Sequence, residues 1–393
     1  MSRVLVLNCG SSSVKYRLHD ADAVREALTD PTRPAAPGLA GGLVERIGEP
    51  DGGPADHAAA LRQVMDQLDL ADLVAVGHRV VHGGTRFTEP TLIDDAVLTE
   101  IRDLVPLAPL HNPANLAGIE VARRTLPGVP QVAVFDTAFH QTMPEAAATY
   151  AIDAATAERH QIRRYGFHGT SHAYVSRRTA ALLNRPYEEI NTITLHLGNG
   201  ASACAVAAGR SVATSMGMSP LEGLVMGTRS GDVDPTVVFH LRRAAGMAVD
   251  EIDNLLNHRS GLLGLSGVND MRKVLRRRAA GDPGASLAFD VYCRRVRSYV
   301  GAYYALLGRL DAITFTAGVG QHAAAVRAEA LDGLDRLGIA VDPARNAGSG
   351  DRLISPPEAP VATCVVATDE EWEIARGTLG VVTGGLTPGA SGR

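Results

Sequence analysis

Cysteine is scarce in this 393-residue chain, and its spacing excludes several kinds of site. The four cysteines lie far apart and form no CxxC pair, so zinc and redox motifs of that type are absent. The chain opens on an apolar stretch of strand character at residues 4–7, and no cleavable apolar segment follows it. Disulfides are not expected in a chain of this length without a secretory signal, so we predict a reducing, cytoplasmic location.

Long apolar runs and a strong excess of one charge are also lacking. No run is long enough to cross a bilayer, so we expect no membrane partner. The 38 basic and 43 acidic side chains give a formal net charge of −5, which offers no reason to expect nucleic acid or an anionic membrane surface as a partner. The chain does contain 45% hydrophobic and 21% charged residues, which is typical of a globular protein, and its length predicts two domains.

Short apolar runs of strand character alternate with longer helical patterns along the chain. Such alternation indicates an α/β fold with a largely buried sheet in each half. The Pro- and Gly-rich stretch 31–54 is predicted to be a loop, and the stretch from residue 377 is predicted to end in a frayed tail. The clearest predicted strands are 4–7, 132–135, 192–197 and 313–316, and the clearest predicted helices are 58–68, 98–125 and 285–310.

Two segments repeat one local plan, in which a polar turn joins two strands. VLVLNCGSSSVKYRL stands near the start, and LHLGNGASACAVAAG begins at Leu195. Both place Asn and Gly at the tip of a hairpin between apolar alternations. The repeat predicts two domains of like topology facing one cleft, with chance similarity of two hairpins as the alternative.

The turns of these hairpins have the composition of phosphate sites. In the first turn, Gly and successive Ser residues offer backbone N–H groups and hydroxyls, and Lys15 adds a mobile charge. The P-loop pattern is absent, so a plain surface hairpin fits these residues equally well. In the second turn, glycines on both sides of Asn199 allow close approach of a ligand, although Asn-Gly is also a common hairpin turn. The GxG at Gly318 follows a strand and is weak evidence for a nucleotide on its own.

Two arginines stand out because glycines surround them. Arg79 lies in GHRVVHGG and Arg229 lies in GTRSGD. Arginines in Gly-rich loops suit bidentate capture of carboxylate or phosphate, although a single arginine is usually a surface residue.

Carboxylates and histidines complete the set of candidates. Asp136 directly follows a predicted strand, where α/β folds place catalytic groups and helices place N-caps. His168 and His172 have HxxxH spacing, but the Glu of HExxH is missing and Gly169 disfavours a helix, so zinc is not expected. Glu370 fits either the acidic first turn of a helix or a metal site.

Eight segments in series closely resemble acetate kinase, and the resemblance runs from residue 4 to about residue 378. They occur in the order and spacing expected of that family and are together highly specific. The segments are NCGSSSVKY, GHRVVHGG, PLHNP, FDTAFH, YGFHGTSH, HLGNG, SMGMSPLEGL and MGTRSGDVDP.

The resemblance implies an α/β fold of two duplicated ββαβα domains around a nucleotide cleft. This is the ribonuclease H-like, actin-like ATPase fold, shared with sugar kinases and chaperone ATPases. The expected N-terminal domain is 1–140 plus about 371–385, the C-terminal nucleotide-binding domain is 141–370, and 386–393 is a flexible tail. The implied activity is reversible, in-line transfer of a phosphoryl group from ATP to acetate, giving acetyl phosphate and ADP. Mg²⁺ is the implied metal, with Mn²⁺ as a substitute, and a homodimer is the implied assembly.

The resemblance also implies roles for individual residues. Mg²⁺ would be held by Asn8 and Glu370. Acetate and the phosphoryl group would meet Arg79 and Arg229, with His168 stabilising the transition state, Asp136 as the catalytic carboxylate and His111 lining the site. The acetate methyl group would enter an apolar pocket of Val81, Leu110, Phe167 and Pro220. The nucleotide would contact Lys15, Ser11, Ser13, His196, Leu197, Gly198, Asn199, Gly200, Asp270, Met271, Arg272, Gly318, Val319, Gly320, Gln321 and His322.

Acetate is ionised at neutral pH and needs no strong base, so Asp136 is expected to orient an arginine or a metal-bound water. The chain departs from the family where Gln321-His322 replaces the usual Glu-Asn, which bears on nucleotide preference. Smaller departures are Ala213 for Asp, Asp369 for Asn, and a loop at 267–272 that is one residue short.

Two other functions remain open at this point. A kinase of the same fold could prefer propionate or butyrate, because one methylene changes binding by only about 1–3 kcal/mol. A non-catalytic nucleotide switch of the actin or chaperone kind is the second alternative, but it has no use for two anion-binding arginines beside a methyl-sized pocket.

Overall fold

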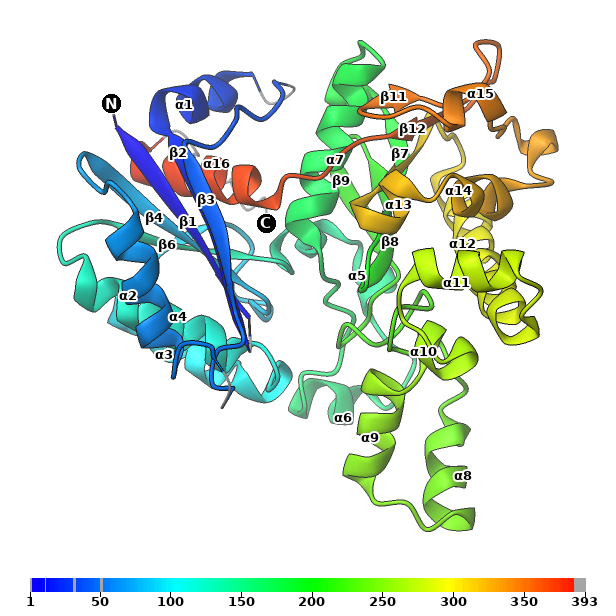
Figure 1. The fold of residues 1–393 in the computed structure, drawn as a ribbon, viewed down its shortest axis with the longest axis horizontal. Coiled ribbons are helices and arrows are strands. Elements are labelled where there is room, and N and C mark those ends of the chain that lie inside the picture. The colour runs from blue at the N-terminus through cyan, green and yellow to red at the C-terminus, as the bar shows by residue number, and fades with distance from the viewer. Residues whose placement is uncertain (1, 11, 31–32, 50–51, 385–393) are drawn as a thin grey trace. The chain divides into compact units, whose positions relative to one another are not determined.

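The computed structural model describes residues 2–10, 12–30, 33–49 and 52–384, and the chain divides into two compact units (Figure 1). The first unit consists of Met1–Gln141, Gly169–Tyr174 and Asp369–Arg393. The second unit consists of Thr142–His168 and Val175–Thr368. The expected tail 386–393 and the phosphate-site candidate Ser11 lie outside the described residues.

The first unit is built on a mixed six-stranded sheet of order β3-β2-β1-β4-β6-β5. Strands β3, β2 and β1 form an antiparallel meander. Strands β1, β4 and β6 run parallel to one another, and β5 is antiparallel to β6. In the first hairpin, Cys9 is paired with Val14, as the turn composition predicted. The strands are β1 (Arg3–Cys9), β2 (Ser13–Asp20), β3 (Ala40–Glu45), β4 (Leu73–Val80), β5 (Thr91–Leu92) and β6 (Gln131–Phe135).

The second unit repeats this topology in a sheet of order β9-β8-β7-β10-β12-β11. Here too an antiparallel meander leads into three parallel strands and an antiparallel edge strand. The duplicated α/β fold expected from the two hairpins is therefore confirmed. The strands are β7 (Asn191–Leu197), β8 (Ala201–Ala207), β9 (Arg210–Thr214), β10 (Ala312–Thr316), β11 (Arg352–Leu353) and β12 (Ala362–Val365).

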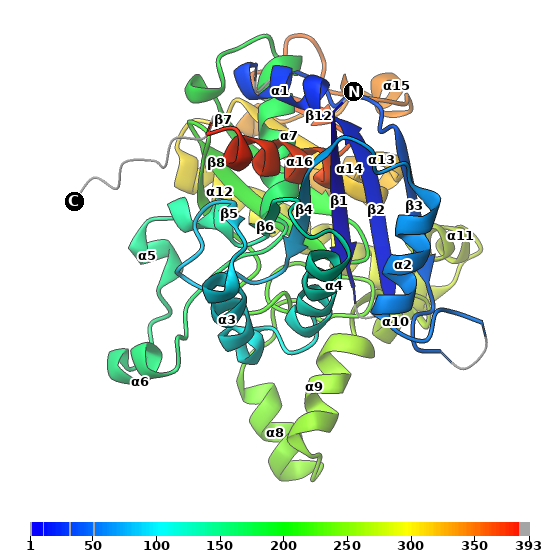
Figure 2. The same ribbon diagram turned by 90° about the vertical axis from the view of Figure 1, so that its left-hand side faces the viewer.

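Helices cover both faces of the first sheet (Figures 1 and 2). Helices α2 and α4 pack on one face, and α16 packs along β1, β4 and β6 on the other, with α1 beside it. Gly77 on β4 allows this close approach, because a Cβ there would lie 2.2 Å from Thr378 Oγ1 of α16. The helices are α1 (Ala21–Thr29), α2 (His57–Gln67), α3 (Asp95–Asp103), α4 (Asn112–Thr125) and α16 (Glu370–Val382).

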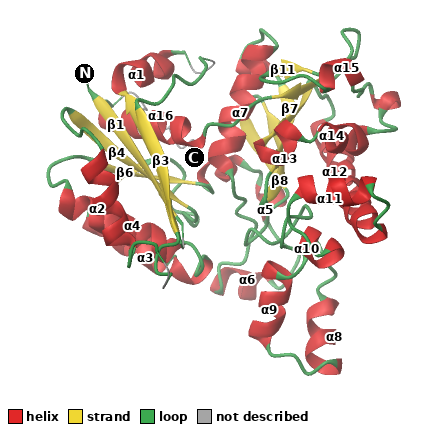
Figure 3. Cartoon of the chain, viewed as in Figure 1, coloured by secondary structure: helices red, strands yellow, loops and turns green. Residues whose placement is uncertain are grey.

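In the second unit, α7 and the long helix α12 cover opposite faces of the sheet (Figure 3). Thr179 of α7 is hydrogen-bonded to Thr314 of β10 at 2.8 Å, while α12 contacts β7 and β8. The helices are α5 (Glu145–Ala148), α6 (Ala154–Arg159), α7 (Gly169–Leu182, whose first turn belongs to the first unit), α8 (Thr236–Ala244), α9 (Val249–His258), α10 (Gly261–Ser266), α11 (Met271–Ala279), α12 (Pro283–Leu307), α13 (Ala317–His322), α14 (Ala324–Leu331) and α15 (Pro343–Asn346).

Aspartate side chains cap many of these helices. An Asp carboxylate accepts a hydrogen bond from a backbone N–H of the first turn, which satisfies a donor that the helix leaves without a partner. The capped helices are α1, α2, α3, α6, α11, α12, α15 and α16.

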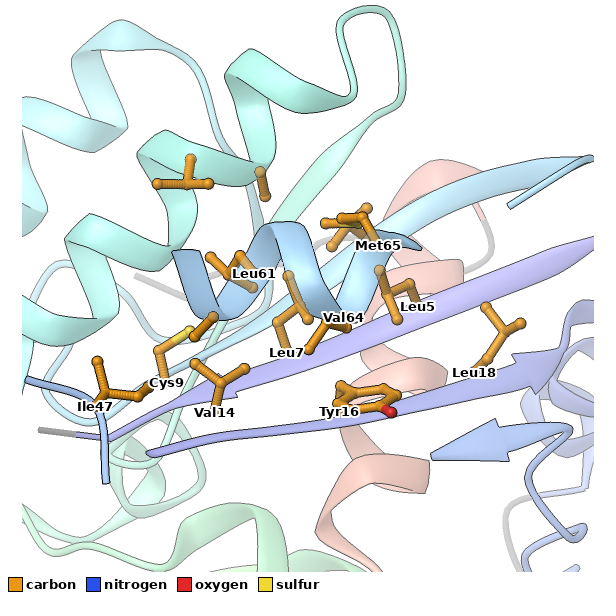
Figure 4. Close-up of a cluster of buried hydrophobic side chains, with 14 residues drawn as sticks. Leu5, Leu7, Cys9, Val14, Tyr16, Leu18, Ile47, Leu61, Val64 and Met65 are labelled. Carbon is orange, nitrogen blue, oxygen red and sulfur yellow. The ribbon is translucent and has the colours of Figure 1, made fainter. Parts of the chain in front are cut away.

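The core of the first sheet shows why the strands were recognisable. Leu5, Leu7 and Cys9 alternate along β1 and point to one face, where they pack on α2 (Figure 4). Leu61 and Val64 of α2, both with no exposed surface, complete that layer. The apolar residues that recur every second position on the strand and every 3.6 positions on the helix therefore pack in one cluster.

Four local predictions were wrong. Gly169 was expected to disfavour a helix, but it is the first residue of α7, which also contains His172. The predicted helix 98–125 is two helices, α3 and α4, because three prolines between residues 106 and 113 interrupt the backbone hydrogen-bond pattern. The predicted loop 31–54 contains the edge strand β3, which pairs with β2 despite two glycines. Arg79 lies on strand β4 and not in a loop.

All four cysteines are free and buried. Burial raises the pKa of the Cys9, Cys204, Cys293 and Cys364 thiols to about 12, so they are inert, protonated core residues. Among the described residues, no helix is both long and apolar enough to cross a membrane.

Candidate active site

A buried ion pair joins the ends of two neighbouring parallel strands in the first unit. Arg79 is paired with Val134 across β4 and β6, and Asp136 follows the end of β6, where its backbone N–H donates to Val80 O at 3.0 Å. The guanidinium binds the carboxylate with both arms, from Nε to Oδ1 at 3.0 Å and from Nη2 to Oδ2 at 2.5 Å. The Asp136 side chain is 1% exposed and that of Arg79 is 21% exposed, so one edge of the guanidinium still reaches solvent.

Burial and the neighbouring charges act in opposite directions on this pair. Burial opposes the charge on Arg79, but Asp136 and Glu370 outweigh burial and raise the pKa of the guanidinium above its ordinary value. Burial raises the pKa of the Asp136 carboxyl, and Arg79 acts in the opposite direction. Because both carboxylate oxygens accept hydrogen bonds from Arg79, Asp136 is suited to orient that arginine and not to accept a proton.

Oxygen donors suited to a hard cation lie beside the pair. Asn8 Oδ1 accepts from Arg79 Nη1 at 3.2 Å, and Glu370 Oε2 lies 3.9 Å from Arg79 Nε. Thr170 donates to the same Glu370 oxygen at 3.4 Å. In the described part of the chain, no group of three or more His, Cys, Asp or Glu side chains gathers as a metal cluster. One amide oxygen and one carboxylate fit Mg²⁺, which typically takes one or two carboxylates plus substrate phosphates.

The first hairpin turn places two more candidates in this unit. Gly10 N donates to Ser13 O at 2.8 Å and closes the turn. The Lys15 ammonium, 48% exposed, lies 2.6 Å from Glu371 Oε1. Lys15 is therefore held by an acid next to Glu370 while its charge remains accessible.

Of the apolar and histidine candidates of the first unit, Val81 follows the end of β4, and Leu110 and His111 directly precede α4. His111 precedes α4, and its charge lowers the pKa of the Asp136 carboxyl. Val81 is 8% exposed, whereas Leu110 is 55% exposed. The buried residues Asn112 and Asn115 were missed by the sequence reasoning: Asn112 Oδ1 accepts from His82 N at 3.2 Å, and Asn115 Oδ1 accepts from Val81 N at 3.1 Å. The two asparagines in the segment NPAN after PLH were the available signal. Burying a side-chain amide costs free energy unless it forms hydrogen bonds, so two asparagines on the buried side of a helix suggest that they hold a nearby backbone.

In the second unit, two histidines and an arginine surround the tip of the second hairpin. His168 adopts a left-handed conformation (φ 57°) just before α7, and its Nδ1 is 2.9 Å from Ser202 Oγ. Its ring stacks on His196 with centroids 4.2 Å apart. A Cβ built on Gly200 would lie 3.4 Å from the His168 ring and 3.6 Å from Arg229 Nη1, so both groups flank this turn.

Arg229 differs from Arg79 in having no acidic partner. Its Nη1 donates to the carbonyl of Pro220 at 3.2 Å, and no carboxylate of the described residues forms an ion pair with it. Burial lowers the pKa of the guanidinium. Arginine is not deprotonated in proteins, so the side chain keeps its charge. A half-buried permanent cation without a counterion is suited to bind an anion.

An arginine network that sequence reasoning missed holds the segment around Pro220. Arg164 Nη1 donates to the carbonyls of Thr214, Ser215 and Met216 at 3.1–3.2 Å, and its Nη2 lies 2.5 Å from Glu222 Oε1. The Tyr150 hydroxyl donates to Glu222 Oε2. Tyr165 N donates to Gly217 O at 3.0 Å, so the backbone that carries Phe167 is tied to the loop that carries Pro220.

A cavity of about 570 Å³ opens in the second unit next to the Asn199 turn. Eight of the predicted nucleotide residues line it, and Leu262, Asn269, Leu275 and Ala323 line it without having been predicted. Asp270 also serves as the N-cap of α11, and its ion pair with Arg272 lowers the pKa of its carboxyl to about 2. The eight predicted residues are Gly198, Asn199, Asp270, Met271, Arg272, Gly318, Val319 and His322.

Five predicted nucleotide residues of this unit do not line that cavity. His196 and Gly200 lie at the hairpin tip beside His168. Leu197 ends β7 and has no exposed surface. Gly320 is packed inside α13 against Phe315, and Gln321 lines a separate, smaller pocket.

A family model, related sequences and solved structures all match nearly the whole length of this chain. The Acetokinase family matches residues 3–376. An acetate kinase of Streptomyces avermitilis is 58% identical, over 97% of this chain and 98% of its own length. The solved structure of Porphyromonas gingivalis acetate kinase has a TM-score of 0.89 at 41% identity and covers 97% of this chain and 100% of its own. A propionate kinase from Francisella tularensis also has a TM-score of 0.89 at 41% identity, over 96% and 99% of the two chains.

The packing around Gly217 yields a prediction about stability. A Cβ at this position would lie 1.8 Å from Glu222 Oε2 and 2.1 Å from the Tyr150 hydroxyl, so Gly217→Ala must displace the Arg164 network. We expect a loss of about 1–3 kcal/mol in the free energy of unfolding, measured by urea titration. Gly301→Ala is the matched control, since nothing lies within 4 Å of its Cβ in α12, and it should stabilise by about 0.5–1 kcal/mol. Equal effects of the two substitutions would contradict the packing described here.

Proposed function

This chain belongs to the acetokinase family and is an acetate kinase that uses ATP and a divalent metal, and we propose roles for its residues on that premise. The observation that carries the proposal is the contrast between the two arginines. Arg79 is fixed in place by Asp136, whereas Arg229 forms no ion pair with an acid in the described ranges of the chain. The first is pre-oriented and the second is a free anion receptor, which suits binding of acetate and of the phosphoryl group in transit.

Acetate attacks as an ionised carboxylate, so the chemistry requires positioning and charge neutralisation more than proton removal. Arg79 and Arg229 would bind the acetate carboxylate and the equatorial oxygens of the phosphoryl group. His168, whose ring is held by Ser202 and stacked on His196, would donate a hydrogen bond to the transition state. Asp136 acts through Arg79 as a positioning residue, and His111 adds a positive charge near that pair.

The nucleotide would bind through both hairpin turns and the 570 Å³ cavity. The adenosine would occupy the cavity between the α11 start and α13, with the turn from His196 to Gly200 along its phosphates. Lys15, with Ser13 and Ser11, would contact the phosphates from the first hairpin.

The divalent metal is proposed to be Mg²⁺, with Mn²⁺ able to substitute. Asn8 and Glu370 would hold it, since they supply the oxygen donors that Mg²⁺ prefers. When bound, the metal neutralises charge on the phosphates.

The acyl pocket is proposed to consist of Val81, Leu110, Phe167 and Pro220. Phe167 is 2% exposed, and the backbone that carries it is tied to the Pro220 loop, so we expect these two side chains to be held in place. We propose acetate as the best substrate and propionate as a secondary one, because an extra methylene costs about 1–3 kcal/mol at most. The likeness to a propionate kinase keeps propionate preference as the alternative.

Replacing Arg229 tests the reaction and the site together. We expect Arg229→Ala to lower turnover by about 10³–10⁵, because a positioned arginine neutralises transition-state charge. Formation of acetyl hydroxamate from Mg-ATP and acetate is the measurement, with propionate and butyrate run in parallel. The control is Arg210→Ala, at an exposed position on β9, which should keep full activity. Turnover of Arg229→Ala within tenfold of the unchanged chain would remove Arg229 from the mechanism, and faster turnover with propionate than with acetate would reverse the substrate order.

Replacing Glu370 tests the metal site. Glu370→Gln keeps the shape of the side chain but removes its charge, so we expect roughly tenfold or more Mg²⁺ to be needed for the half-maximal rate. Titration of the rate with Mg²⁺ at fixed ATP measures this. Glu371→Gln, which instead breaks the pair with Lys15, should leave the metal requirement unchanged. Identical Mg²⁺ curves for Glu370→Gln and the unchanged chain would exclude Glu370 as a ligand.

We also propose that the chain forms a homodimer in the cytoplasm. Four buried, free cysteines fit a reducing compartment. Helix α8 has no buried residue, and Phe239 on it is 54% exposed, as expected of a surface that a second copy covers.

Sedimentation tests the assembly. We expect a mass of twice the 41.3 kDa chain, and we expect Phe239→Glu to shift the equilibrium toward the monomer because it places a charge in an apolar contact. His240→Glu adds the same charge one residue away and is the control. A single-chain mass for the unchanged protein at micromolar concentration would overturn the dimer, and an unshifted equilibrium in Phe239→Glu would exclude α8 from the interface.

A further inference from the structure

The second unit contains another pocket, of about 170 Å³, that the proposed reaction does not use. It lies at the junction of α13, α14, α15 and the glycine-rich loop 347–350. It shares only His322 with the 570 Å³ cavity, so it is a separate space. Its lining residues are Gln321, His322, Ala324, Arg327, Asn346, Ala347, Gly348, Ser349, Gly350, Arg352, Val365 and Ala367.

Two arginines converge in this pocket. Arg327 is 1% exposed, and its Nη2 donates to the carbonyl oxygen of Asn346 at 2.7 Å. Arg352 Nη2 donates to the same oxygen at 3.0 Å. Two guanidinium groups that share one acceptor atom hold two positive charges close together, which is unfavourable unless a negative charge compensates them.

Within the described part of the chain, neither arginine forms an ion pair with a carboxylate. The other bonds of Arg327 go to Asn346 Oδ1 and to the carbonyls of Gly320 and Gln321, all neutral. None of the lining residues is Asp or Glu. The neighbouring Asp351 is engaged elsewhere, because its Oδ1 accepts from Ala367 N at 2.8 Å and its Oδ2 lies 3.7 Å from Arg178.

The electrostatic cost appears as a lowered pKa of the buried Arg327 guanidinium. Burial, and next the charge of Arg352, lower the pKa of Arg327 to about 10. Burial also lowers the pKa of Arg352. Gln321 is neutral, so this side of the pocket offers no negative charge either.

We propose that this pocket binds a small tetrahedral oxyanion of the inorganic phosphate type. Arg352 supplies the accessible charge, since it is only half buried and its three hydrogen bonds leave donors free on both terminal nitrogens. Ser349 adds a hydroxyl from the loop. A volume of about 170 Å³ suits one oxyanion with water and is too small for a whole nucleotide, since sites for larger ligands span roughly 300–1,000 Å³.

The test is calorimetric titration of the full chain with inorganic phosphate. Saturating Mg²⁺ and a non-hydrolysable ATP analogue fill the phosphoryl position of the active site. We expect saturable binding at a single site in the unchanged chain and at least tenfold weaker binding in Arg352→Gln, because one charged hydrogen-bonding partner is lost. Potassium chloride at matched ionic strength should give no saturable signal.

Two further variants make the result interpretable. Arg345→Gln removes an equal charge from α15, whose guanidinium reaches Ser355 O at 3.4 Å and does not line the pocket, so phosphate affinity should stay within twofold. Gln321→Glu places a carboxylate in the pocket and should weaken phosphate binding as strongly as Arg352→Gln. The circular dichroism spectrum and the thermal unfolding midpoint of each variant check that it is folded.

Two results would overturn the proposal. One is the absence of saturable phosphate binding in the unchanged chain. The other is equal phosphate affinity in the unchanged chain, Arg352→Gln and Gln321→Glu, which would place any bound phosphate elsewhere. Neither result would affect the kinase assignment, because acyl phosphate formation is measured separately.

Discussion

The bidentate pair between Arg79 and Asp136 is the interaction on which the first unit's site depends. It exists because β4 and β6 are parallel neighbours, so that residues at their ends meet at one edge of the sheet. Burial makes the pair obligatory: an unpaired carboxylate that is 1% exposed would be strongly disfavoured. Asn8 and Glu370 then lie beside a guanidinium that cannot swing away.

The second unit has the same topology, but the charges at its site are arranged differently. Its hairpin tip is flanked by Arg229 without a carboxylate and by the stacked rings of His168 and His196. His168 has a strained, left-handed backbone conformation. The hydrogen bond to Ser202 and the backbone hydrogen bonds from residues 165 and 166 to Gly217 hold it in that conformation. The same strand order therefore positions Arg79, which is held by a carboxylate, in the first unit and Arg229, which is not, in the second.

The arginines of this chain show how strongly context decides role. Arg164 donates mainly to backbone carbonyls and shapes a loop, and Arg79 is neutralised by a carboxylate. Arg229, Arg327 and Arg352 form no ion pair with any acid among the residues that the structure describes, and all three have a pKa lowered by burial. Residue type alone could not separate these groups, because the difference lies in the atoms that surround each guanidinium.

The sequence by itself determined the α/β class, the two hairpins and the buried strands, because alternation and turn chemistry are local properties. It also located Asp136 at a strand end and Arg229 in a loop. Local patterns missed β3, whose glycines resemble a loop until β2 supplies its hydrogen bonds.

Only the tertiary structure decided which charges meet. The partnership of Arg79 with Asp136, the hold of Asn115 on Val81, the Arg164 network and the convergence of Arg327 with Arg352 all join residues that lie apart in the sequence. Such contacts depend on strand order and helix packing, which bring distant segments together through burial of apolar surface. No periodicity or spacing in the sequence encodes them directly.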